Sequence, residues 1–172
     1  KSQITFSYIA HAQDIFRYDN MKVNEVTQIA KSDYCLYIIV PGRFHLDFLN
    51  NLGVPIQKMS INPQIVYKDY FSFNEKKALI KSVCAIGRFV EKKGFEYLIQ
   101  AAKYLEKDKI SIHLYGYGDL EDEYQALISA TGAKNVFMEG RLNNSSEVSA
   151  ALQKHDILIQ PSVVALNGDM DG

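Results

Sequence analysis

The second half of the chain alternates short apolar runs with amphipathic segments, and this order restricts the fold more than any other feature of the sequence. From residue 82 onward, apolar runs predict strands, and apolar residues at helical spacing between them predict helices. The strands are expected at 82–87, 110–115, 135–139 and 156–160, and the helices at 92–106, 119–131 and 145–154. This alternation is typical of a parallel sheet whose strands are connected by helices. We therefore predict an α/β fold for this half.

The first part of the chain shows the same pattern more loosely. It predicts strands at 4–9, 35–40 and 58–61, and helices at 21–31 and 44–52. Two or three strands make a poor independent sheet, so we expect this part to be the end of a larger domain. A charged segment at 68–81 separates the two parts, and we interpret it as a linker.

Composition excludes several classes of protein. The 172 residues are 47% hydrophobic, with a net charge of -1 and interspersed signs, so no basic field for nucleic acid is expected. The longest apolar run ends at Pro41, far short of the roughly 20 residues that span a bilayer. Cys35 and Cys84 lie in predicted strands and are interpreted as buried, reduced thiols. Because the chain begins at Lys1 without an initiator Met, we expect it to be a piece of a longer protein.

The segment GRFVEKKG, residues 87–94, follows a predicted strand and leads into a helix. Arg88 and Lys93 are therefore expected at the carboxyl end of a strand, where open α/β sheets bind ligands and where helix amides favour an anion. The ligand would be a phosphate or a diphosphate. The alternative, two solvated basic residues on a surface loop, is given equal weight on this pattern alone.

The other strands of this half also end in Gly, Pro or Ser. YGYGD follows the second strand, and there Asp119 is predicted to be the N-cap of the next helix. EGR follows the third strand and QPSVV the fourth, so the four strand ends are expected to form one floor. A helix-capping pair is predicted at Asn144 and Glu147.

The histidines are less informative. His11 follows an apolar strand and would be a general base, a phosphate donor or a hydrogen-bonded packing residue, of which packing is favoured on composition. His45, His113 and His155 have no neighbours in the sequence that suggest chemistry. No acidic cluster is convincingly placed to hold a metal ion near the predicted anion site.

Taken together, GRFVEKKGFEYLIQA, LYGYGD, NVFMEGR and HDILIQPSVVALNGDMDG closely resemble the carboxyl-terminal domain of family 4 retaining glycosyltransferases of the GT-B fold. The last segment is most similar to bacterial exopolysaccharide, colanic-acid and capsular-polysaccharide transferases. The resemblance implies an α/β GT-B architecture, with Rossmann-like parallel sheets that carry helices on both faces. It implies three parts. Residues 1–67 would be the end of an amino-terminal, acceptor-side domain, residues 68–81 would be the interdomain linker, and residues 82–172 would be a truncated nucleotide-sugar-binding domain.

The resemblance also implies roles for individual residues. Arg88 and Lys93 would hold the donor diphosphate, and His11 would face the reacting sugar. The remaining residues, expected to border the diphosphate, nucleotide or base, are Gly87, Gly94, Gly116, Gly118, Arg141, Leu142 and Ser162. The family normally continues beyond the end of this sequence with two glutamates that touch the donor. We therefore expect an internal fragment with no transferase activity in isolation.

The implied activity is that of a retaining hexosyltransferase in cell-surface polysaccharide biosynthesis. It would move a sugar from a UDP- or GDP-sugar to a hydroxyl of a glycan or lipid-linked acceptor, without a metal or other cofactor. The expected location is cytoplasmic, with association at the inner face of the membrane left open. The alternatives are a GT-B-like sugar-nucleotide epimerase and a non-catalytic nucleotide-binding or scaffold module.

Overall fold

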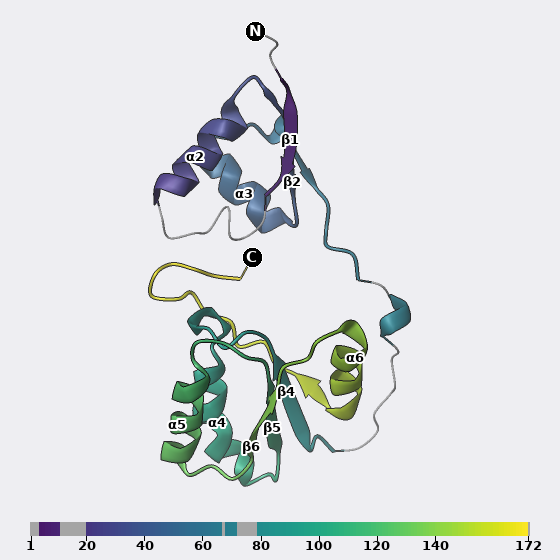
Figure 1. Cartoon of the computed structure of the whole chain (residues 1–172), viewed down its shortest axis with the longest axis vertical. Coiled ribbons are helices and arrows are strands. Elements are labelled where there is room, and N and C mark those ends of the chain that lie inside the picture. Colours follow the sequence, from purple (N-terminus) through teal and green to yellow (C-terminus); the bar gives the residue numbers. More distant parts are fainter. Residues whose placement is uncertain (1–3, 11–19, 67, 72–78, 172) are drawn as a thin grey trace. The chain divides into compact units, whose positions relative to one another are not determined.

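The chain forms two compact units, each built on a parallel sheet. The structure, a computed structural model, describes residues 4–10, 20–66, 68–71 and 79–171. One unit contains Lys1–Val66 with Val164–Gly172, and the other contains Tyr67–Val163 (Figure 1). Half of the predicted linker, residues 72–78, lies outside the described residues, and the assignment of the units to the two domains of the family stays a prediction.

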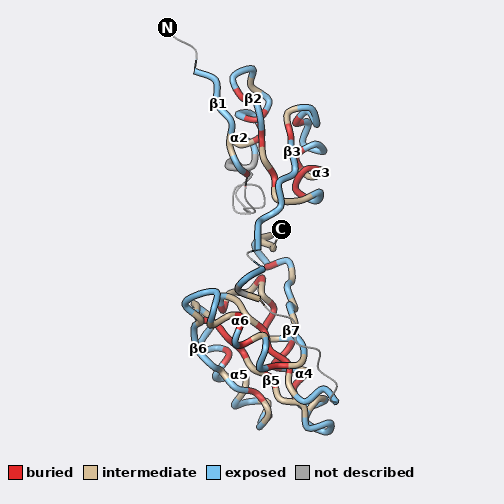
Figure 2. Tube along the Cα trace, turned by 90° about the vertical axis from the view of Figure 1, so that its right-hand side faces the viewer, coloured by how far each residue is buried: buried red, intermediate tan, exposed pale blue. Residues whose placement is uncertain are grey.

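The first unit has a three-stranded parallel sheet in the order β1-β2-β3. Its strands are β1 (Phe6–Ile9), β2 (Cys35–Val40) and β3 (Met59–Ile61), and its α-helices are α2 (Asn20–Lys31) and α3 (Arg43–Asn51). Short 3-10 turns lie at Ile56–Lys58 and, in the second unit, at Lys68–Tyr70. The core of the first unit includes Ile38, Val40 and Leu49, whereas β1 is largely exposed (Figure 2).

The second unit has a four-stranded parallel sheet in the order β6-β5-β4-β7. Its strands are β4 (Ser82–Ile86), β5 (Ser111–Tyr115), β6 (Val136–Gly140) and β7 (Ile157–Leu158). The helices are α4 (Phe95–Glu106), α5 (Glu121–Thr131) and α6 (Ser145–Lys154), with a 3-10 turn, η3, at Glu91–Lys93. The predicted alternation of strands and helices in this half is therefore confirmed.

The helices of the second unit cover both faces of the sheet (Figure 1). Residues of α4 and α5 pack with Val83, Ala85, Ile112 and Leu114 in the main core. On the opposite face, Ala151 of α6 packs with Cys84 and Tyr115. Because neighbouring residues of a strand point to opposite faces, each strand contributes alternate residues to the two layers.

N-caps were predicted from the sequence at the starts of two helices, and the structure confirms only one of them. The Asn144 side chain accepts a hydrogen bond from the Glu147 amide at 2.9 Å and the Glu147 carboxylate accepts from the Asn143 amide at 2.7 Å, so the predicted cap of α6 is confirmed. The prediction that Asp119 caps α5 is wrong. The N-cap residue there is Leu120, whose side chain makes no capping hydrogen bond. The negative charges of the first turn, Glu121–Glu123, stabilise the N-terminus of the helix through its dipole instead.

Both cysteines are buried and unbridged, as predicted, with Cys35 and Cys84 each 1% exposed. In the part of the chain that the structure describes, we find no helix that is both long enough and apolar enough to cross a membrane.

Candidate functional site

The ends of β4, β5 and β6 are joined into one continuous edge by backbone hydrogen bonds. The Gly87 amide donates to the Tyr115 carbonyl at 3.0 Å, and the Phe89 amide donates to the Tyr117 carbonyl at 2.7 Å. The Gly116 amide donates to the Gly140 carbonyl at 2.8 Å. These bonds extend the sheet beyond its last regular residues, so the loops that follow three different strands are held in fixed positions.

A cavity of about 210 Å³ lies at this edge. Its lining comes from the ends of β4, β5 and β6 and from α6: Ile86, Gly87, Arg88, Tyr115, Gly116, Tyr117, Arg141, Leu142 and Val148. The structure thus brings together residues that the sequence placed at three separate strand ends. A pocket at the carboxyl edge of a parallel sheet is the usual ligand position in such folds.

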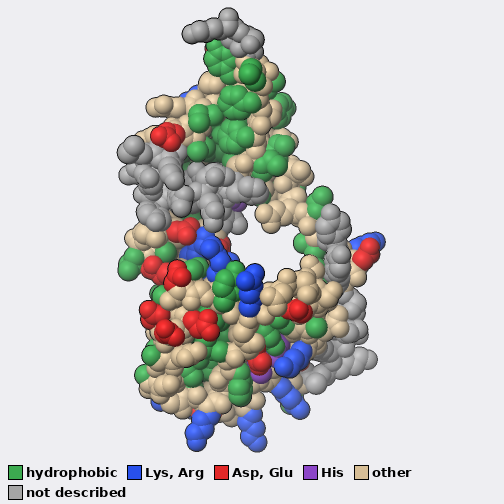
Figure 3. Space-filling view, in the orientation of Figure 1, with side chains coloured by type: hydrophobic (Ala, Val, Ile, Leu, Met, Phe, Trp, Pro, Cys, Tyr) green, Lys and Arg blue, Asp and Glu red, His purple; other side chains and the backbone are tan. Residues whose placement is uncertain are grey.

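Arg88 and Lys93 both border Gly87 at this edge. Arg88 is the next residue and lines the cavity. A methyl group added to Gly87 would lie 3.4 Å from Lys93 Cδ and 3.5 Å from Lys93 Cε, so the lysine side chain passes directly beside the glycine. Blue side chains gather at the corresponding edge of the lower unit in Figure 3, whereas red ones lie over the α5 side. The two predicted cations therefore occupy one neighbourhood.

An aromatic cluster fixes the loop that carries Arg88. The adjacent Phe89 is fully buried, with its ring 5.6 Å from that of Phe95 and 5.5 Å from that of Tyr124. Burial, with smaller contributions from Glu96, Glu123 and Glu91, raises the pKa of Tyr124 to about 12. The phenol stays neutral at physiological pH, and the cluster anchors the loop by apolar packing.

Several of the predicted glycines have a local reason to be glycine. A Cβ on Gly116 would overlap the Gly87 carbonyl oxygen, and one on Gly118 would lie 2.6 Å from the Phe89 carbonyl oxygen. At Gly94, which has φ of 62°, a Cβ would overlap the Pro161 carbonyl oxygen. From the sequence, these glycines were expected to border a ligand. The structure shows that close approach of the protein's own backbone already requires glycine at these positions.

Four predicted site residues that the structure describes are not among the residues that line the cavity: Lys93, Gly94, Gly118 and Ser162. Ser162 is exposed and follows β7, in a segment whose Val163 amide donates to the Lys92 carbonyl at 2.9 Å. Its backbone therefore runs beside η3, next to Lys93, and the role predicted for it stays a prediction. His11 lies outside the described residues.

Two tyrosines of the cavity lining, Tyr115 and Tyr117, were not predicted from the sequence. The Arg141 guanidinium lies over the Tyr117 ring, 4.3 Å from its centroid, in a cation–π contact. Tyr115 lines the cavity and its hydroxyl lies 3.0 Å from His155 Nε2. Burial, followed by the Glu139 and Cys84 charges, raises the pKa of Tyr115. The signal was present in YGYGD, since both tyrosines adjoin the glycine that ends the strand.

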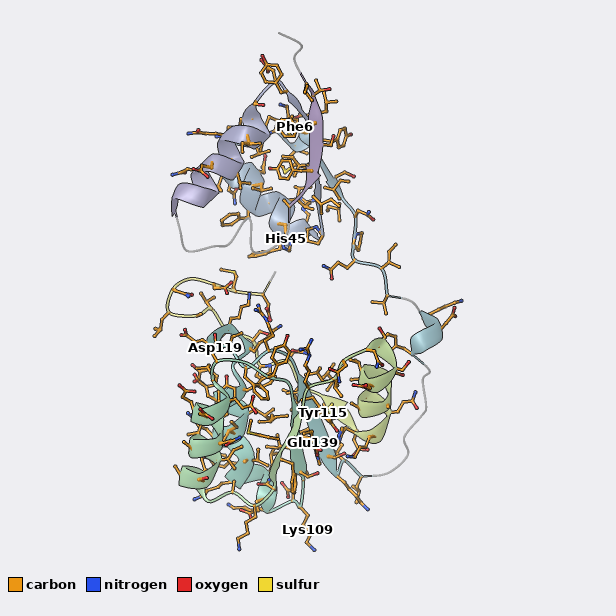
Figure 4. The ribbon with its side chains drawn as sticks, viewed as in Figure 1. Phe6, His45, Lys109, Tyr115, Asp119 and Glu139 are labelled. Carbon is orange, nitrogen blue, oxygen red and sulfur yellow. The ribbon has the colours of Figure 1, made fainter. Side chains whose placement is uncertain are left out.

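The sequence also gave no role to His113 and His155, yet the structure connects them. His113 Nδ1 lies 2.6 Å from Glu139 Oε1, and the two imidazole rings are 4.3 Å apart. Figure 4 shows Tyr115 and Glu139 together near the middle of the sheet, with Asp119 at the edge that carries the strand ends and Lys109 at the opposite edge. Among the described residues, no group of three or more His, Cys, Asp and Glu side chains is placed to hold a metal ion.

A parallel α/β unit with a cavity at its carboxyl edge is the architecture of a nucleotide-binding class of folds to which the GT-B proteins belong. The sequence model of the family described as glycosyl transferases group 1 matches residues 68–167, more than half of the chain. The chain belongs to this family, so the family and fold predicted from the motifs are confirmed.

Curated relatives of the chain include two bacterial polysaccharide enzymes. The amylovoran biosynthesis glycosyltransferase AmsK of Erwinia amylovora is 26% identical over 125 residues, which are 70% of this chain and 31% of the relative. The putative colanic acid biosynthesis glycosyltransferase WcaL of Escherichia coli is 28% identical over 128 residues, covering 72% and 32% respectively. The chain thus spans about a third of the length of these relatives.

Solved structures show the same fold at lower sequence identity. Anabaena Alr3699/HepE, in a complex with UDP and glucose, superposes with a TM-score of 0.73 at 12% identity, covering 92% of this chain and 46% of that one. Staphylococcus aureus TarM, as a mutant in a complex with Fondaparinux, alpha-GlcNAc-glycerol and UDP, gives a TM-score of 0.70 at 21% identity, covering 92% and 32%. At these identities the likeness concerns the fold.

Proposed function

We propose that the protein is a retaining glycosyltransferase that moves a hexosyl group from a nucleotide diphosphate sugar to an acceptor hydroxyl in cell-surface polysaccharide biosynthesis. The observation that carries the proposal is that Arg88 lines the cavity and that the Lys93 side chain passes beside Gly87, which lines it too. Membership of the family supports transfer, and the names of AmsK and WcaL support the polysaccharide context.

The chemistry of the departing group explains why two cations would help. When the bond to the anomeric carbon breaks, negative charge accumulates on the diphosphate, and fixed positive charges stabilise that state more than the ground state. Arg88 has a planar fork of donors that matches two phosphate oxygens, and Lys93 supplies a compact charge. Because these side chains can neutralise the leaving group, we propose that transfer proceeds without a metal ion.

The rest of the cavity suits a nucleoside. Leu142, Val148 and Ile86 supply apolar surface, and Tyr117 with Arg141 supplies a flat, cationic wall. Such a surface can pack against a base and ribose while the basic residues hold the phosphates. The UDP in the Alr3699/HepE and TarM structures supports UDP as the first donor nucleotide to test, with GDP as the second.

The test combines nucleotide binding and turnover in the whole protein. UDP and GDP are titrated in a thermal-shift assay, because a ligand at a hundred times its Kd adds about 2.7 kcal/mol to stability. Arg88→Ala and Lys93→Ala are each expected to lower kcat by about a hundredfold or more. Lys103→Ala, which removes an exposed lysine from α4, is the matched control and should leave turnover unchanged. Wild-type rates in both Arg88→Ala and Lys93→Ala would refute the proposed diphosphate site.

Product analysis distinguishes the proposal from its rivals. A donor labelled in the sugar would yield a labelled glycan of unchanged anomeric configuration if the protein is a retaining transferase. A sugar-nucleotide epimerase would instead return a labelled nucleotide sugar of altered stereochemistry. A scaffold module would bind nucleotide yet turn over no donor with any acceptor. Addition of EDTA without loss of rate would support transfer that needs no metal.

A further inference from the structure

A chain of polar side chains crosses the α6 face of the second unit, directly behind the cavity. Ser111, His113 and Tyr115 occupy alternate positions of β5 and therefore point to the same face. His113 Nε2 lies 3.0 Å from Ser111 Oγ, and the Tyr115 hydroxyl lies 3.0 Å from His155 Nε2. His155, the C-cap residue of α6, is only 3% exposed. None of these contacts belongs to the proposed diphosphate site.

Glu139 of β6 adds a carboxylate to this chain. Val136 and Met138 of β6 pack in the main core, so Phe137 and Glu139, at the intervening positions, lie on the α6 face. Residues of β5 and β6 pair regularly up to Leu114 with Met138, after which Tyr115 pairs with Gly140. Here the Glu139 carboxylate lies 2.6 Å from His113 Nδ1, and that hydrogen bond is the main reason why the pKa of Glu139 is lowered.

His113 lies between two polar partners on this face. Its Nδ1 faces the Glu139 carboxylate, which only accepts hydrogen bonds, so Nδ1 is the donor in that contact. Its Nε2 faces Ser111 Oγ, and this hydroxyl also lies 3.3 Å from the Lys81 carbonyl oxygen. His113 thus connects β6 with the start of β5.

His155 lies directly against His113, with the two rings 4.3 Å apart. Lys154 lies in the same neighbourhood, and the facing groups on the sheet are Glu139, Cys84 and Tyr115. The Tyr115 hydroxyl lies within hydrogen-bond distance of His155 Nε2, at 3.0 Å, so this contact connects the C-cap residue of α6 to β5.

We infer that His155 is a positioning residue for the proposed donor site, because its Nε2 holds the Tyr115 side chain in the floor of the cavity. The inference rests on the proposed function only for the identity of the ligand, a nucleoside diphosphate. Tyr115 shares this floor with Ile86, Leu142 and Val148. If the hydroxyl lost this hydrogen-bond partner, the buried ring would move toward another one and the floor would change shape.

The first experiment detects the Tyr115–His155 hydrogen bond directly. Long-range ¹⁵N–¹H spectra of the ¹⁵N-labelled protein are recorded for the wild type and for Tyr115→Phe. The His155 Nε2 signal, assigned with His155→Gln, is expected to shift in Tyr115→Phe, because that variant removes its hydrogen-bond partner. An unchanged signal would overturn the inference. This measurement requires neither a nucleotide nor turnover.

The second experiment measures UDP affinity by calorimetry in a double-mutant cycle. Tyr115→Phe and His155→Leu are each expected to weaken binding about fivefold, and the double variant should be no weaker than either, because the two act through one hydrogen bond. His155→Gln keeps an acceptor at that position and should recover affinity to within about twofold of wild type. Tyr104→Phe on α4, where the side chain is exposed, is the matched control.

The outcomes separate the inference from the proposed function. Additive losses in the double variant, or no recovery in His155→Gln, would overturn the positioning role, provided that circular dichroism shows each variant folded. If the unmodified protein bound neither UDP nor GDP, the proposed donor site would fail. The imidazole spectra would still decide whether Tyr115 is hydrogen-bonded to His155 in that case.

Discussion

The two faces of the sheet in the second unit are made by the same strands and yet serve different purposes. Toward α4 and α5, β4 and β5 present Val83, Ala85, Ile112 and Leu114, which join a continuous apolar core. Toward α6, the intervening residues of β5 are Ser111, His113 and Tyr115, which form hydrogen bonds. A single strand, β5, therefore stabilises the fold with the residues on its apolar face and shapes the cavity with the residues on its polar face.

The first prediction tests the apolar face. Phe89→Ala removes a fully buried ring from the cluster with Phe95 and Tyr124, and it should lower the free energy of unfolding by about 3–5 kcal/mol. Urea unfolding followed by circular dichroism measures the loss. If the variant does not fold, Phe89→Leu gives the same test with a smaller cavity. A loss below about 1 kcal/mol would contradict the anchoring role of this cluster.

The second prediction concerns the edge where the two faces meet. In Gly116→Ala the new methyl group would overlap the Gly87 carbonyl, so the loops after β4 and β5 must separate, at a cost of about 1–3 kcal/mol. Gly132→Ala is the comparison variant. A methyl group added at Gly132 would meet open space, so this variant should lose only the strain energy of an alanine in a left-handed backbone, about 1 kcal/mol. An equal cost for both variants in urea unfolding would argue against close packing at Gly116.

The third prediction concerns α6, which covers the polar face. Asn144→Ala removes the side-chain cap on the Glu147 amide and should destabilise the unit by about 1 kcal/mol. Hydrogen exchange of the first-turn amides of α6 should become faster in this variant. Ser146→Ala alters an exposed residue of the same turn and should leave exchange unchanged. Equal protection in the wild type and in Asn144→Ala would show that packing alone holds the helix start.

The smallest effect is a pH dependence that belongs to the polar face. The hydrogen bond from His113 lowers the pKa of Glu139 below that of an ordinary glutamate, so the stabilisation by this carboxylate is complete above the ordinary, unfolded-state pKa. It is lost as the pH falls through the lower, folded-state pKa. Because Glu139 is partly exposed, we expect well under about 1 kcal/mol. Glu139→Gln should flatten this part of the acid unfolding curve, and an unchanged curve would remove Glu139 as a source of pH dependence.

Local sequence patterns predicted the elements of both units because strand and helix periodicities are short-range signals. The same patterns placed Arg88, Gly116 and Arg141 at strand ends, and the parallel topology then brought them to one cavity. The polar chain behind the cavity was not predictable in this way. His113, Glu139 and His155 come from elements that are distant in the sequence, and only the pairing of β5 with β6 and the packing of α6 bring them together.

The chain contains two cysteines, and each is buried in a different unit, Cys35 in the first and Cys84 in the second. A buried thiol reacts with an alkylating reagent only after the surrounding structure opens. The labelling rate of each cysteine therefore reports the local opening of its own unit, without any engineered probe. A nucleotide bound at the edge of the β4 sheet would protect Cys84 while leaving the rate at Cys35 as an internal reference.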